Sequence, residues 1–130
     1  MILFLYQNVE IIIFFDFEED FMGGYMEVSK RDWKLYREKI AGWQEAYMEK
    51  LIASYVDYLN SDEAASDKFW ELEKRIKRDR ENPGVCIELC KSDMPFDLIR
   101  LINESVITVN DLDEFSEDLR DMVKFLTERM

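Results

Sequence analysis

The chain has 130 residues, the length of a single domain, and its 17 basic and 29 acidic residues give a formal net charge of −12. Because cations drive binding to phosphate, this balance disfavours general attraction to nucleic acid or to an anionic membrane. The chain contains no histidine, so it lacks the commonest general base and metal ligand. We therefore expect a non-enzymatic cytoplasmic protein with no cofactor and no metal.

The first 25 residues differ from the rest of the chain. They contain no lysine or arginine, five acidic residues and many Ile, Phe, Leu and Tyr residues. The positive start of a secretory signal is missing, and polar residues at 7–10 interrupt the apolar run that a membrane span needs. Read as ordinary protein, residues 1–6 and 10–15 have the composition of two short strands, a marginal structure by itself.

The genetic code offers a different interpretation of this segment. Residues 23–26, GGYM, can be encoded by GGA-GGA-TAT-ATG, which is a purine-rich ribosome-binding sequence followed by a start codon. We therefore predict that residues 1–25 are a translated leader, or else an apolar and acidic extension outside the core. In this interpretation Met26 is the native start, and residues 26–130 form one helical domain.

A short helix is expected just after residue 26. Ser29 and Asp32 have the spacing of a capping box, in which a hydroxyl and a carboxylate satisfy the first backbone amides of a helix. Trp33, Tyr36 and Ile40 then recur on one face. Gly42 weakens the pattern, and we predict a break or kink there.

Two amphipathic helices follow, at about residues 43–60 and 63–81. Apolar residues of the first form a stripe at four-residue steps with a neighbouring row beside it: Trp43, Tyr47, Leu51, Tyr55 and Leu59, then Met48, Ile52 and Val56. The predicted inner face of the second is Ala65, Phe69, Leu72 and Ile76. Polar residues at 60–62 separate the helices, so we expect an antiparallel hairpin whose apolar faces meet and form the frame of the bundle.

Residues 85–91 are too short to classify by periodicity. Val85, Ile87 and Leu89 alternate as in a strand, yet Val85 and Leu89 also fit one helical turn. No strand partner is evident after Met26, which favours a helix. Cys86 and Cys90 match neither a redox motif nor half of a zinc site, and we interpret them as buried thiols.

Two further helices are predicted, at about residues 94–103 and 110–128. Ser92 and Asp93 would cap the first, whose apolar positions are Phe96, Leu98, Ile99, Leu101 and Ile102. A stripe of Leu112, Phe115, Leu119, Met122 and Leu126, flanked by Val123, defines the second. The turn between them loosely resembles a helix-turn-helix, but Ser105 stands where such turns often use glycine, and we interpret it as a connection within the core.

Residues 74–80 hold the only concentration of cations, five basic residues against one acid. They either bind an acidic partner or phosphates, or form a solvated helix face, and the second interpretation is favoured because phosphate binders usually carry a basic domain. Tyr58 and Trp70 lie off the main apolar stripes and are candidates for a contact surface. The candidate partner-binding residues are therefore Tyr58, Trp70, Lys74, Arg75, Lys77, Arg78 and Arg80.

No phosphate-binding, nucleotide-binding, hydrolase or zinc signature occurs in the chain. The sequence predicts an all-α bundle built on the hairpin of residues 43–60 and 63–81. The expected function is a protein-interaction or regulatory module that binds another protein or itself, and not a membrane. The alternative is a nucleic-acid-binding regulator that uses the basic face from Lys74 to Arg80.

Overall fold

The structure is a computed structural model that describes residues 2–4 and 27–129. Its helices and strands, in chain order, are β1 (Ile2–Phe4), α2 (Lys30–Leu59), α3 (Ala65–Asp79), β2 (Cys86–Glu88), η2 (Lys91–Asp93), α4 (Met94–Asn103), η3 (Val109–Leu112) and α5 (Glu117–Arg129). The predicted all-α class is confirmed, with four α-helices in the described ranges. The prediction of a leader falls mostly on residues outside those ranges.

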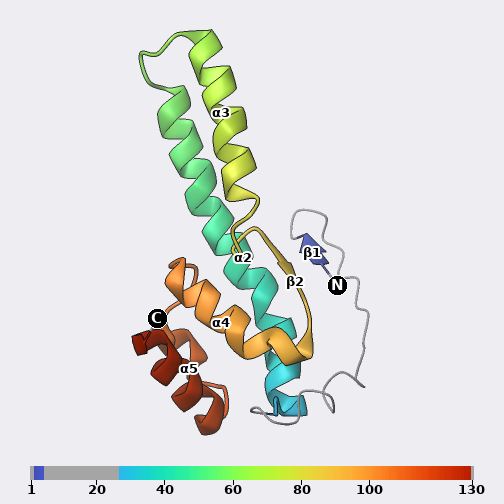
Figure 1. The fold of residues 1–130 in the computed structure, drawn as a ribbon. Coiled ribbons are helices and arrows are strands. Elements are labelled where there is room, and N and C mark those ends of the chain that lie inside the picture. The colour runs from blue at the N-terminus through green and yellow to red at the C-terminus, as the bar shows by residue number, and fades with distance from the viewer. Residues whose placement is uncertain (1, 5–26, 130) are drawn as a thin grey trace.

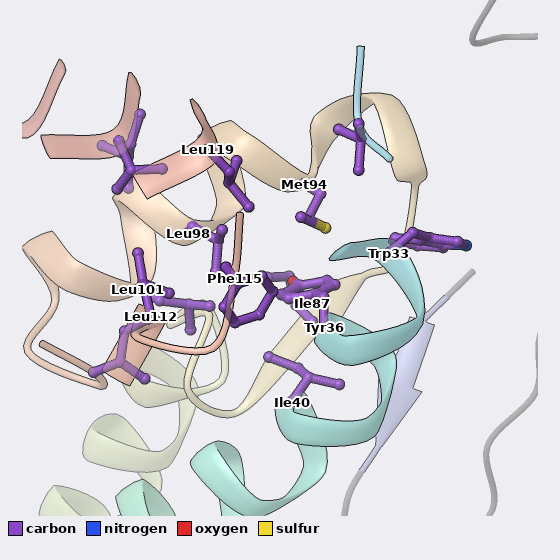
Figure 2. Close-up of a cluster of buried hydrophobic side chains, with 14 of the residues drawn as sticks. Trp33, Tyr36, Ile40, Ile87, Met94, Leu98, Leu101, Leu112, Phe115 and Leu119 are labelled. Carbon is purple, nitrogen blue, oxygen red and sulfur yellow. The ribbon is translucent and has the colours of Figure 1, made fainter. Parts of the chain in front are cut away.

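The hydrophobic core lies around the N-terminal half of α2. Tyr36 and Ile40 of α2 face Met94 and Leu98 of α4, while Phe115 fills the space between them (Figure 2). Leu112, Leu119 and Val123 complete the core from η3 and α5. The predicted buried face of Trp33, Tyr36 and Ile40 is therefore confirmed. We refer to this part of the molecule as the body.

The predicted capping box at the start of α2 is only half formed. Ser29 caps the helix, and its Oγ accepts a hydrogen bond from the backbone N–H of Asp32 at 3.0 Å. The Asp32 carboxylate is buried and accepts instead from the N–H and the hydroxyl of Ser116, at 2.9 and 2.5 Å. It thereby ties the start of α2 to the start of α5.

The predicted break at Gly42 is wrong, because α2 runs unbroken for 30 residues. A Cβ at Gly42 would meet nothing within 4 Å, so this glycine lies on an open helix surface. A single glycine costs a helix only about 1 kcal/mol relative to alanine. Packing of the residues on either side, Ile40 and Gln44, outweighs that cost.

Residues 86–88 form a strand, so the preference for a helix at 85–91 is wrong. The partner is β1, upstream of Met26, with Leu3 paired to Ile87 in antiparallel register. The helix was predicted because no partner strand was evident after Met26. The backbone of residues 2–4 supplies this pairing, and the interpretation of residues 1–25 as a translated leader stays a prediction.

Three details of the C-terminal region differ from the prediction. The expected helix at 110–128 is divided into η3 and α5, because Asp111 closes a capping box with Thr108 and Ser116 starts a new helix. Phe96 is 45 % exposed rather than buried. Asp93 precedes α4 but makes no side-chain cap, and the Ser92 hydroxyl lies instead 3.2 Å from the sulfur of Cys90.

Candidate interaction surface on the helical arm

The C-terminal half of α2 and the whole of α3 extend away from the body as a two-helix projection (Figure 1). We call residues 45–80 the arm. Tyr58 near the end of α2 contacts Asp67 near the start of α3, whereas Tyr55 contacts Asp79 at the end of α3. The order of these contacts means that α3 runs back alongside α2 toward the body.

Polar groups connect the two helices of the arm at its body end. The Tyr55 hydroxyl donates to Asp79 Oδ2 at 2.5 Å, and Arg78 Nε donates to Asp79 Oδ1 at 3.0 Å. Burial would raise the pKa of Asp79, but these two hydrogen bonds lower it below its usual value. Burial and the bond to Asp79 raise the pKa of Tyr55 to about 12.

A second polar contact lies further along the arm. The Arg75 guanidinium sits 4.2 Å from the centre of the Tyr58 ring, and Arg75 Nε donates to Glu71 at 2.9 Å. The Tyr58 hydroxyl points to the Asp67 carbonyl oxygen at 3.4 Å. Tyr58 and Arg75, two of the predicted partner-binding residues, are thus part of the contact between the helices.

Several apolar residues that were predicted to lie between these helices are exposed instead. Phe69 is 64 % exposed, Ile76 is 43 % exposed, and Ala65 is also exposed. On α2, Ile52, Val56 and Leu59 are exposed as well. Tyr55 and Tyr58 contact Asp79 and Arg75 between the helices, and Leu51 and Leu72 are part-buried, whereas these other apolar side chains face outward.

The exposed apolar residues lie on one side of the arm. Each residue of a helix is rotated by about 100° about the helix axis from the one before it. Relative to the direction of Tyr55, which faces α3, the side chains of Ile52, Val56 and Leu59 are rotated by roughly 40° to 100°. On α3, the side chains of Phe69 and Ile76 are rotated about the helix axis by roughly 60° to 80° from the direction of Asp79, in the same sense. Since the helices run in opposite directions, equal rotation leads to the same side. We call this surface, formed by Ile52, Val56, Leu59, Phe69 and Ile76, the apolar flank.

Trp70 adds to the apolar area beside the flank. It is 63 % exposed, and its ring packs edge-on against Phe69 with a centroid separation of 4.9 Å. It lies on the face of α3 that points away from α2, as its position off the main stripe suggested. Large aromatic residues on a surface are typical of protein contacts.

The basic residues of α3 are largely engaged within the chain. Lys77 lies 3.5 Å from Glu73, Arg75 pairs with Glu71, and Arg78 pairs with Asp79. Lys74 and Arg80 are exposed. The ion pairs neutralise three of the five cations, which weighs against a phosphate-binding face. The nucleic-acid alternative stays a prediction.

The body holds polar atoms that could suggest chemistry. Burial raises the pKa of Asp97 to about 7, and Arg100 lies 3.5 Å from its Oδ1. Tyr36 Oη and Asp97 Oδ2 are buried without a hydrogen-bond partner among the described residues. Asp97 and Tyr36 come from α4 and α2, and no cluster of potential metal ligands occurs in the described ranges.

The two cysteines lack the properties of reactive thiols. Cys86 and Cys90 are half-buried, and burial raises the pKa of both thiols, which makes them poor nucleophiles. Within residues 27–129, no helix has the length and hydropathy required to cross a bilayer.

The flank includes residues that the sequence analysis assigned to the core. Ile52, Val56, Phe69 and Ile76 fit a helical stripe, and a stripe alone does not reveal whether it meets a partner helix or solvent. One feature of the sequence could have indicated an exposed face. Few residues of α3 are apolar, yet they lie on one side of the helix, so most of its surface is suited to solvent. Comparisons with protein families, with curated proteins and with solved structures found no match to this chain.

Proposed function

We propose that this protein is a non-enzymatic cytoplasmic interaction module that binds a protein through the apolar flank of its arm. The observation that carries the proposal is the outward orientation of Ile52, Val56 and Phe69 on a projection whose two helices are connected by the polar contacts of Tyr55 and Tyr58. Contiguous exposed apolar surface is costly in water and in soluble proteins commonly marks a binding site.

The arrangement of the arm supports the same conclusion. A helical pair that projects from a body offers two parallel ridges of side chains, a geometry suited to packing against further helices. Phe69 and Trp70 at the surface supply large anchors of the kind that dominate binding energy. The body forms the base of the arm, since α2 contributes to its core and continues into the arm.

Affinity capture tests this proposal. The full chain is immobilised and exposed to host-cell lysate, beside a Phe69→Ser variant and a matched Phe125→Ser variant. Phe125 is 52 % exposed on α5, so its replacement removes a similar apolar area away from the arm. We expect Phe69→Ser to lose the bound protein, whether a second copy or another chain, and Phe125→Ser to retain it. Equal capture by wild type and Phe69→Ser would refute the proposal, as would a wild type that binds nothing and does not self-associate.

A further inference from the structure

We infer that the apolar flank binds a second copy of this chain, so that two arms lie side by side as a four-helix bundle. This inference rests on the proposed function and names the partner. It is carried by the charges that border the flank, which complement those of a second copy.

The arm carries little of the charge that would keep two copies apart. Residues 45–80 contain seven basic and nine acidic residues, a net charge of −2 out of the −12 of the whole chain. The rest of the chain therefore holds most of the negative charge. Repulsion between like-charged molecules opposes association least at the arm.

The two edges of the flank have opposite charge. Glu45 and Glu49 are exposed on the α2 edge. They lie on the same side of α2 as Val56. On the α3 edge, Glu73 is paired with Lys77 at 3.5 Å, and Arg80 beside Ile76 is exposed, so this edge carries a net positive charge. Because Tyr55 contacts Asp79, Glu49 and Arg80 lie toward the same body end of the arm, offset along it by roughly 8 Å at 1.5 Å per residue.

One twofold arrangement brings these opposite charges together. If the symmetry axis runs along the arm, α2 of one copy lies against α3 of the other, and Glu49 of each copy meets Arg80 of its partner. All neighbouring helices then run in opposite directions, as in an up-down four-helix bundle. The same residues form both halves of the contact, which is the rule for a twofold dimer.

Within residues 27–129, the body leaves room for this contact. Tyr36 and Ile40 point from α2 into the body, on the opposite side of the helix from the flank. Toward the N-terminus the flank side of α2 continues with the exposed residues Lys34 and Glu38. Two bodies can therefore lie at the same end of the bundle, each on the outside.

Analytical ultracentrifugation of full-length charge variants tests the pairing. We expect the wild type to dimerise, and Glu49→Arg and Arg80→Glu each to weaken dimerisation about tenfold, because like charges then meet. The double variant Glu49→Arg with Arg80→Glu restores the opposite charges and should recover the wild-type dissociation constant within about threefold. Lys124→Glu, on exposed α5, is the control and should change it little.

A distance measurement tests the orientation of the arms. Spin labels are placed at Glu38→Cys in a Cys86→Ser, Cys90→Ser background whose circular dichroism matches the wild type. With arms side by side, the labels lie within roughly 30 Å of each other. An arrangement with the bodies at opposite ends separates them by roughly 50 Å, because residue 38 is far from the middle of the flank.

The results distinguish this inference from the proposed function. A wild type that stays monomeric at 0.5 mM overturns the inference, as does a dimer that the single charge reversals leave unchanged or that shows the longer label distance. If the protein is monomeric while Phe69→Ser abolishes capture of a different chain, the inference fails and the proposed function stands. A dimer that follows the charge exchange and shows the shorter distance supports both.

Discussion

The Tyr55 hydroxyl donates a hydrogen bond of 2.5 Å to the Asp79 carboxylate and joins α2 to α3 where the arm meets the body. Both side chains are buried although both are polar. This bond lies where the sequence pattern predicted apolar contact. It closes the arm while leaving the apolar residues of both helices on the flank.

Replacing Tyr55 by phenylalanine tests this connection. The change removes the hydroxyl and leaves the buried Asp79 with one donor fewer, so we expect a loss of about 1 to 2 kcal/mol in the free energy of unfolding. Urea denaturation followed by circular dichroism measures it. Tyr58→Phe is the control, since its hydroxyl bond is longer at 3.4 Å and exposed, and its removal should cost less than about 0.5 kcal/mol. Equal costs for the two variants would contradict this account.

Asp97 should make stability depend on pH. Burial raises its pKa to about 7 in the folded state, above the value of an unfolded aspartate, despite the opposing charge of Arg100. The folded state therefore binds more protons than the unfolded state between about pH 4 and pH 7, and this group's contribution to stability falls as the pH rises through that window.

The Asp97→Asn variant isolates this effect, because the amide is neutral at every pH. We expect it to be more stable than the wild type near pH 8, by at most about 4 kcal/mol, with the difference shrinking toward about pH 4. Urea midpoints of both proteins at several pH values test this. A difference that is the same at all pH values would exclude titration of Asp97 as the cause.

Gly84 and Gly42 should respond to alanine in opposite ways. A Cβ at buried Gly84 would lie 2.4 Å from the Tyr47 ring and 2.8 Å from Val106, so we expect Gly84→Ala to destabilise the protein by about 1 to 3 kcal/mol. At Gly42 a Cβ meets nothing, and alanine should stabilise the helix by about 0.5 to 1 kcal/mol. Thermal unfolding of the two variants measures both. If both variants were more stable than the wild type, or both less stable, the close approach at Gly84 would not explain the change in stability.

Ser105 has a positive φ of 60° in the turn after α4. The backbone N–H of Ser105 donates to the carbonyl oxygen of Ile102, and that of Val106 donates to the carbonyl oxygen of Leu101. This is the Schellman motif, which ends an α-helix at a residue in the left-handed conformation. Glycine adopts this conformation without steric cost, so Ser105→Gly should raise stability by about 0.5 to 1 kcal/mol. The same change at exposed Ser54, inside α2, should lower it by a similar amount. Chemical denaturation that ranks the two variants in the reverse order would contradict the role of the cap.

Several predictions from the sequence depended on local rules and are confirmed. Ser29 caps α2, the polar residues after Leu59 end it, and Trp33, Tyr36 and Ile40 are buried. These features depend on neighbouring residues in the chain, through caps and helical periodicity.

Predictions that required knowledge of distant residues were wrong. The strand at Cys86–Glu88 depends on pairing with Ile2–Phe4, far away in the chain. The Asp32 carboxylate does not complete the predicted capping box, because it accepts hydrogen bonds from the N–H and the hydroxyl of Ser116. Gly42 stays helical because packing on both sides of it outweighs its weak propensity.

The sequence by itself determined most of the helical segments and which positions on them are apolar, because these properties arise within a few residues of chain. Only the tertiary structure decided which apolar faces are buried. Tyr55 and Asp79 bond across the arm, and the body packs on the other side of α2, so Phe69 and Ile76 remain at the surface. An apolar stripe requires removal from water but does not specify the surface that covers it.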